Sequence, residues 1–140
     1  MRSLSFAWGL FLLGCGSTTY ATVMPEELRE YYTEFKHECE KSWRAKSCKN
    51  RLPLLKEIKI EKIKDPKVIG QATWYPFPDA YYKITIDPRG PDLRSTLFHE
   101  LGHVIGQEHQ SNSCIMATNY RPAVLYGGWE QCKWQFFQVK

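Results

Sequence analysis

Apolar side chains along the chain recur with two different periods, and each period predicts a kind of element. Between residues 25 and 46 they recur at steps of three and four, which predicts an amphipathic helix. The apolar positions of this helix are Leu28, Tyr31, Tyr32, Phe35, Cys39 and Trp43. Pro25 suits the first helical position, and Glu26 and Glu27 suit the positive end of the helix dipole.

Three later stretches alternate between apolar and polar residues, which is the period of a half-buried strand. The first lies around Ile58 and Ile60, the second covers about 68–75, and the third covers 80–87. The segment 76–79 contains two prolines and predicts a hairpin-like turn between the last two strands. The third strand is expected to place three side chains on one face, namely Tyr82, Ile84 and Ile86.

A second helix is predicted to begin at the N-cap residue Asp92, because the breakers between residues 88 and 91 end any element before it. Its apolar arc consists of Leu93, Leu97, Leu101 and Val104, widened by Ile105. At roughly 100° per residue, His99 and His103 project well away from the centre of this arc. One face is therefore expected to pack on the sheet, and another to present the histidines to a cleft.

These elements predict an α+β fold with an N-terminal helix, a short twisted mixed sheet, the helix after Asp92 and a short C-terminal helix. The last helix is expected around the residues Trp129, Cys132, Lys133, Phe136 and Phe137. The chain contains no internal repeat and no linker, so residues 25–140 are expected to form one domain.

Residues 1–14 have the features of an export signal. A positive residue precedes the mostly apolar residues 4–13, which are too few to span a bilayer permanently. The sequence LLGC, ending at Cys15, resembles the bacterial lipobox, in which cleavage precedes a cysteine that is then lipidated. We expect lipidation there, followed by a tether over residues 15–24 that could in part be a short first strand. The alternative is an ordinary secretory signal cleaved near residues 19–21.

The predicted export and the net charge of the mature protein indicate which classes of partner to expect. A lipoprotein of this kind is expected at the outer membrane or cell surface of a bacterium, and a cleaved secretory protein in the periplasm or the medium. Removal of residues 1–14 lowers the basic residues from 19 to 18 against 15 acidic residues, a net charge of +3. So mild a charge, with no basic run interleaved with aromatic residues, does not indicate nucleic-acid binding. We expect a monomer that contacts the membrane through its anchor.

Four cysteines follow Cys15, and an even number in an exported protein indicates disulfides. Four cysteines allow three pairings. We expect Cys39–Cys48, which would join the first helix to the loop beyond its end. We also expect Cys114–Cys132, which would join the segment after the histidines to the C-terminal segment.

The segment HELGHVIGQEH, which begins at His99, holds three of the four histidines of the chain. His99 and His103 are one helical turn apart, so both imidazoles leave the same face. Gly106 can adopt the left-handed conformation that ends a helix, which lets His109 approach the other two. Three imidazoles can bind Zn²⁺ and leave its fourth position for water. Glu100 is then placed to act as a general base and not as a ligand.

This segment resembles the zinc signature of the metzincin metallopeptidases, H-E-x-x-H-x-x-G-x-x-H. The sequence MATNYR, residues 116–121, resembles the corresponding segment of the matrixins. The resemblance implies a zincin-like fold, one catalytic zinc ion, and Met116 as the methionine of the Met-turn. It also implies an edge strand that receives substrate, with the cleft residues Gly70, Ala72, Trp74 and Tyr120. No D-x-D-type loop indicates a calcium site.

Pattern and resemblance together predict a zinc metalloendopeptidase that hydrolyses peptide bonds in proteins. Glu100 would take the proton of the attacking water and pass it to the leaving amine. The alternative is a non-catalytic, zinc-stabilised protein that holds a peptide in the same cleft. The presence of Glu100 argues against this alternative, because a structural zinc site needs no base and normally closes its fourth position.

Overall fold

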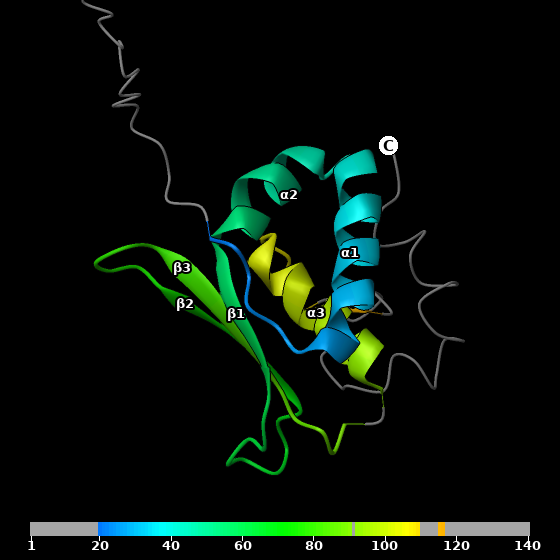
Figure 1. The fold of residues 1–140 in the computed structure, drawn as a ribbon, viewed down its shortest axis with the longest axis vertical. Helices are drawn as coiled ribbons and strands as arrows, with labels where there is room; N and C mark the ends of the chain where they lie inside the picture. Colours follow the sequence, from blue (N-terminus) through cyan, green and yellow to red (C-terminus); the bar gives the residue numbers. More distant parts are fainter. Residues whose placement is uncertain (1–19, 91, 110–114, 117–140) are drawn as a thin grey trace, which may run out of the picture.

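The computed structural model describes residues 20–90, 92–109 and 115–116 of the chain. Within them the predicted α+β class is confirmed, and the helices gather on one face of a small sheet (Figure 1). The elements in chain order are α1 (Glu26–Lys41), α2 (Ala45–Arg51), the 3₁₀ helix η1 (Leu52–Leu54), β1 (Leu55–Ile60), β2 (Gly70–Tyr75), β3 (Tyr81–Ile86) and α3 (Leu93–Val104). None of the helices in these ranges combines the length and the apolar character needed to cross a membrane. The predicted C-terminal helix lies outside the described residues.

The sheet has β3 at its centre, with β1 on one side and β2 on the other. Because β3 runs parallel to β1 and antiparallel to β2, the sheet is mixed, as predicted. The predicted hairpin is confirmed, with Tyr75 paired to Tyr81 at the base of its turn. β2 and β3 begin and end within two residues of their predicted bounds.

Helix α3 lies between the sheet and α1 (Figure 1). The predicted apolar arc is confirmed, and its fully buried members are Leu97, Leu101, Val104 and Ile105. Ile84 and Ile86 of β3 belong to the same buried cluster. On the side of α1, Phe98 packs against Phe35 with 5.5 Å between ring centroids. Helix α3 is thus packed on two sides, which fixes the position of the side chains on its remaining face.

The prediction of one helix over residues 25–46 is wrong in its last part. α1 stops before Ser42, which adopts an extended conformation with a ψ of 172°. The Ser42 hydroxyl donates to the carbonyl of Cys39 at 2.7 Å and accepts from the N–H of Arg44 at 3.1 Å. These bonds compete with the next helical bonds, so the chain leaves the helix here. Trp43, which continues the helical pattern in the sequence, is half exposed in the connection to α2.

Cys39 and Cys48 form the predicted disulfide, with 6.0 Å between their Cα atoms. The predicted position of Cys48 in a loop is wrong, because this residue lies in α2. A continuous helix would separate two residues nine positions apart by about 14 Å. The bond is therefore compatible only with a chain that turns back, and it holds α2 against α1.

The residues just before α1 run beside β1. The N–H of Val23 donates to the carbonyl of Lys56 at 3.0 Å, and the N–H of Ile58 donates to the carbonyl of Val23 at 2.8 Å. Val23 also forms a parallel bridge with Glu57. Residues 20–24 therefore run alongside β1 and form one bridge with it, without becoming a regular strand.

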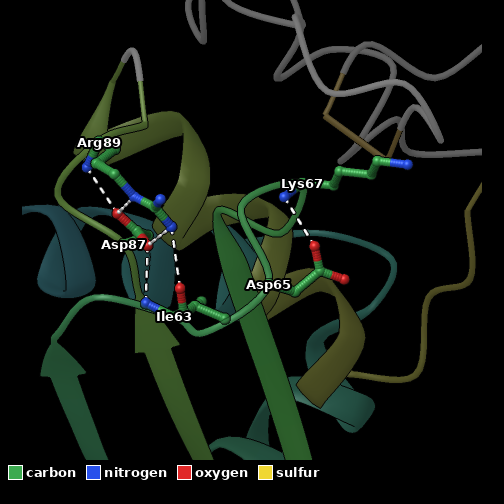
Figure 2. A network of polar contacts seen from close by, with 5 residues as sticks. All are labelled: Ile63, Asp65, Lys67, Asp87 and Arg89. Carbon is green, nitrogen blue, oxygen red and sulfur yellow. Dashed lines mark hydrogen bonds and ion pairs between the residues drawn. The ribbon is translucent and has the colours of Figure 1, made fainter.

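The turn after β3 is fixed by one buried carboxylate, that of Asp87 (Figure 2). Its oxygens accept hydrogen bonds from the backbone N–H groups of Ile63 and Arg89, both at 2.8 Å, and from the Arg89 guanidinium. The Arg89 side chain is the main reason that the pKa of Asp87 lies well below its usual range. The network joins the β1–β2 connection to the chain that leads into α3, and so helps to fix where α3 begins.

Helix α3 begins at Asp92, as predicted. The Asp92 carboxylate accepts hydrogen bonds from the N–H of Arg94 at 3.1 Å and from the hydroxyl of Ser95 at 2.5 Å. The hydroxyl of Thr96 donates to the Asp92 carbonyl at 2.8 Å. Such an N-cap typically stabilises a helix by about 1 kcal/mol relative to alanine.

Candidate metal centre

Two histidines of α3 and one from the segment after it converge at the C-terminal end of the helix. The Nε2 atoms of His99 and His103 are 3.1 Å apart. Gly106 follows with a φ of +95°, the left-handed conformation that ends a helix and favours glycine. The chain then turns back, and Nε2 of His109 lies 3.1 Å from that of His99 and 3.2 Å from that of His103. The structure thus brings the three predicted ligands together.

The outer ring nitrogens of the two helical histidines donate to backbone carbonyls. Nδ1 of His99 faces the carbonyl of Ile115, and Nδ1 of His103 lies 2.9 Å from the carbonyl of Gln107. Because a carbonyl only accepts, each Nδ1 carries the proton and each Nε2 offers a lone pair. Burial lowers the pKa of His99 to about 4 and also lowers the pKa of His103, so both rings are neutral at pH 7. Converging lone pairs repel one another, and a cation between them removes that repulsion.

The spacing of the three nitrogens fits a tetrahedral zinc ion. Zn–N bonds of about 2.0–2.1 Å at tetrahedral angles place the ligand nitrogens about 3.3 Å apart. The observed separations are 3.1–3.2 Å. Among the described residues this is the one group able to hold a metal ion, and it offers three ligands, the number typical of catalytic zinc sites. Because His109 is exposed, the group is open to solvent on that side.

Glu100 follows the first histidine, and its side chain packs against β2. The residue is 4% exposed, and its carboxylate accepts a hydrogen bond from the N–H of Ala72. Gly70 leaves the space for this carboxylate, since a Cβ there would stand 2.5 Å from Oε1 of Glu100 and 2.8 Å from the methyl group of Thr96. Burial raises the pKa of Glu100 to about 8, and the Ala72 hydrogen bond opposes part of that rise. An acidic side chain of α3 is therefore held directly against the edge strand.

The residues predicted to line the cleft have different positions. Gly70 and Ala72 both face the buried Glu100 carboxylate of α3. Trp74 shares their face of β2 by strand alternation, but its ring packs on Tyr82 with 4.4 Å between centroids and stays 42% exposed. Tyr120 lies outside the described residues. β2 is an edge of the described sheet, as predicted.

Met116 is fully buried and belongs to the main apolar cluster. It follows Ile115, whose carbonyl accepts the hydrogen bond from His99, so this segment passes beside one of the three histidines. The predicted lipidation of Cys15 and the predicted disulfide Cys114–Cys132 lie outside the described residues.

Three further residues surround the turn between the histidines and were not predicted from the sequence, namely Arg44, Arg51 and Gln107. The amide of Gln107 is 6% exposed, and with its oxygen toward Arg44 it accepts hydrogen bonds from Nε at 2.6 Å and from Nη2 at 3.1 Å. The guanidinium of Arg51 lies over Gly106, at 3.2 Å from where a Cβ would stand. The arginines and the turn are far apart in the sequence, so packing alone brings them together. The one hint in the sequence was the position of Arg44 between Cys39 and Cys48, inside the loop that the predicted disulfide closes.

The chain matches no protein-family model, no curated protein and no solved structure. The indications of function therefore come from the residues of the site. It combines two neutral imidazoles and a third close to them with a buried carboxylate on the same helix.

Proposed function

We propose that this protein is a zinc-dependent endopeptidase of the metzincin type that hydrolyses peptide bonds in proteins. The observation that carries the proposal is the convergence of three imidazole nitrogens, 3.1–3.2 Å apart, at the end of a helix that also carries a buried carboxylate. His99, His103 and His109 would hold the zinc ion. A bound zinc ion supplies a Lewis acid that polarises a carbonyl and lowers the pKa of water to about 7.

Glu100 is the proposed general base. Its pKa, raised by burial to about 8, gives the carboxylate enough basicity to accept a proton from the attacking water. A cation held by the neighbouring histidines would lower this pKa, because a nearby positive charge favours the carboxylate. As the C–N bond breaks, Glu100 passes the proton to the leaving amine. The N–H of Ala72 orients the carboxylate for both transfers.

The outer edge of β2 is the proposed substrate-binding strand. The N–H of Ala72 points away from β3, since it donates to Glu100, and in a strand the backbone groups two residues on point the same way. The backbone of Trp74 therefore also faces this edge, where an extended peptide can add through main-chain hydrogen bonds. The exposed ring of Trp74 offers an apolar surface to a substrate side chain.

Further parts of the proposal are implied by the resemblance of the sequence to the metzincins and matrixins. They are a zincin-like fold, a matrixin-like Met-turn at Met116 and a contribution of Tyr120 to the pocket beside the cleaved bond. Export, lipidation of Cys15 and a second disulfide between Cys114 and Cys132 also belong to the proposal. The protein would then act on proteins near the membrane surface.

The test combines elemental analysis with digestion of a peptide library by the purified protein. The wild type should contain about one zinc ion per chain and should cleave peptides, and a chelator should abolish the cleavage. His103→Ala should lose most of the zinc, whereas His37→Ala, a change of an exposed histidine on α1, should not. Full zinc in His103→Ala would refute the ligand assignment. Peptides that bind to the zinc-loaded wild type without being cleaved would indicate the alternative, a non-catalytic peptide-binding protein.

A further inference from the structure

Helix α2 contacts the turn between the second and third histidines at both of its ends. Arg51, its last residue, places a guanidinium over Gly106. Arg44, its N-cap residue, donates two hydrogen bonds to Gln107, at 2.6 and 3.1 Å, when the amide is oriented with its oxygen toward the guanidinium, the orientation that satisfies both partners. α2 therefore lies across this turn and contacts it through two arginines.

Gln107 connects the Arg44 contact to the metal group. Its backbone carbonyl accepts the hydrogen bond from Nδ1 of His103 at 2.9 Å, and its backbone N–H donates to the carbonyl of Gly102 at 2.9 Å. The hydrogen bond on Nδ1 of a metal-binding histidine sets the tautomer and the orientation of the ring. A contact that fixes the position of Gln107 therefore also helps to fix the His103 ring, whose Nε2 atom faces the other two histidines.

Arg44 is itself held at several points. Its N–H donates to the Ser42 hydroxyl at 3.1 Å, its carbonyl accepts from the N–H of Cys48 at 3.0 Å, and its guanidinium lies 4.1 Å from the ring centroid of Trp43. It lies inside the loop that the disulfide Cys39–Cys48 closes. The backbone of Arg44 is thus fixed at two points and its guanidinium lies over the Trp43 ring, so the residue loses little further freedom when it binds the Gln107 amide.

We propose that Arg44 is a positioning residue of the metal centre, which acts through Gln107 on His103 and slows the release of the metal ion. The inference rests on the proposed zinc binding and deepens it, because it names a support that the disulfide-closed loop gives to the site. The ligand it serves is a divalent ion bound by three imidazoles. Removal of a group that hydrogen-bonds directly to a metal-ligating histidine typically weakens metal binding by about 10–100-fold, and Arg44, one residue further out, is expected at the lower end of this range.

The test compares four single variants of the full-length chain and the double variant Arg44→Met/Gln107→Leu. Arg44→Met removes the guanidinium at similar length, Arg44→Lys restores a cation, and Gln107→Leu removes the acceptor from the other side. Lys46→Met, on the exposed side of the same helix, is the matched control for loss of one positive charge. The measurements are the rate of zinc transfer to a chromophoric chelator and the visible spectrum of the Co²⁺-substituted protein, which reports ligand geometry.

Arg44→Met and Gln107→Leu should each release zinc about 10-fold faster or more and should alter the Co²⁺ spectrum. The double variant should differ little from either single variant, since both remove the same contact. Arg44→Lys should recover part of the loss, and Lys46→Met should match the wild type.

A wild-type release rate and Co²⁺ spectrum in Arg44→Met would overturn the inference, even if the variant unfolded at a lower temperature. If Arg44→Met does not fold, a wild-type release rate and Co²⁺ spectrum in Gln107→Leu would overturn the inference instead. The proposed function fails separately, if the wild type binds neither zinc nor Co²⁺.

Discussion

Two carboxylates of this protein are buried to a similar degree, yet their surroundings act on them in opposite directions. Asp87, after β3, is fully buried and its pKa lies well below the usual range, chiefly because the Arg89 side chain donates hydrogen bonds to it. Glu100, on α3, is 4% exposed and its pKa is raised to about 8 by burial, with one opposing hydrogen bond from Ala72. The number and charge of the donors, not burial alone, account for the difference.

The two environments suit a carboxylate to different roles, one structural and the other proton transfer. An acid surrounded by donors, one of them cationic, stays ionised and binds a proton only at very low pH, so it stabilises a turn and does no proton transfer. An acid buried with few donors has a pKa close to neutral pH, the range in which a side chain can both accept and release a proton during general acid–base catalysis. The two regions around Asp87 and Glu100 therefore predict different responses to mutation and to pH.

The largest effect is expected for Glu100→Gln. The amide keeps the size of the side chain and can still accept from Ala72, but it cannot take up a proton. Cleavage of a peptide substrate, measured as kcat/KM, should fall by roughly 10²–10⁴, while zinc content stays at the wild-type level. Asp87→Asn should instead keep the wild-type rate per folded molecule and should lower stability. A similar loss of rate in both variants would show that the two carboxylates do not differ in role.

Gly70→Ala should have the next largest effect. The added methyl group would meet Oε1 of Glu100 at 2.5 Å, so the carboxylate or the strand must move. Overpacking of this kind typically costs about 1–3 kcal/mol of unfolding free energy, measurable by urea titration. Gly90→Ala is the matched change beside Asp87, where the closest atom would be a carbonyl oxygen at 3.3 Å. It should cost less, and an equal or greater loss at Gly90 would contradict the prediction.

The metal-free protein should lose stability between pH 6.5 and pH 8. The pKa of Glu100 is about 8 in the folded protein and 4.5 in the reference state, so the folded protein binds the extra proton and stability falls as the pH rises. The loss over this window is up to about 2 kcal/mol. The window also lies above the range in which His99, with its lowered pKa, takes up a proton on unfolding. Urea titrations should show this slope in the wild type and a flatter one in Glu100→Gln.

Arg89→Gln should have the smallest effect. The Arg89 side chain is 40% exposed, and Asp87 keeps the backbone N–H donors of Ile63 and residue 89. The pKa of Asp87 should rise, so part of the stability present above its ordinary value of 3.8 is lost. The difference from the wild type should shrink as the pH falls through the acid range, and peptide cleavage should not change. A change in zinc content would show that the two regions are coupled.

The parts of the site that sequence could predict depend on local spacing. His99 and His103 share a face because they are one helical turn apart, and Gly106 takes the positive φ that its place after the helix suggests. The burial of the apolar arc of α3 follows from the same period. Such features need only the geometry of one element.

The parts that sequence could not predict depend on competition or on distant packing. Trp43 continues the helical pattern, but the hydroxyl of Ser42 offers the backbone a different set of hydrogen bonds and ends α1. The pairing of Arg44 with Gln107 exists only because α2 folds back over the turn. No period or spacing in the chain encodes that contact.

The hydrogen bond from Ala72 to Glu100 also bears on self-association. An open strand edge is a template for pairing with a second chain, and long flat edges lead to aggregation. At the β1 edge, residues 20–24 run alongside the strand, and at the β2 edge a buried acid takes one of the outward donors. A second copy of the chain could not form an unbroken ladder along β2, because the position at Ala72 is already bonded. The same carboxylate proposed to move protons therefore also limits how much of this edge another chain can use.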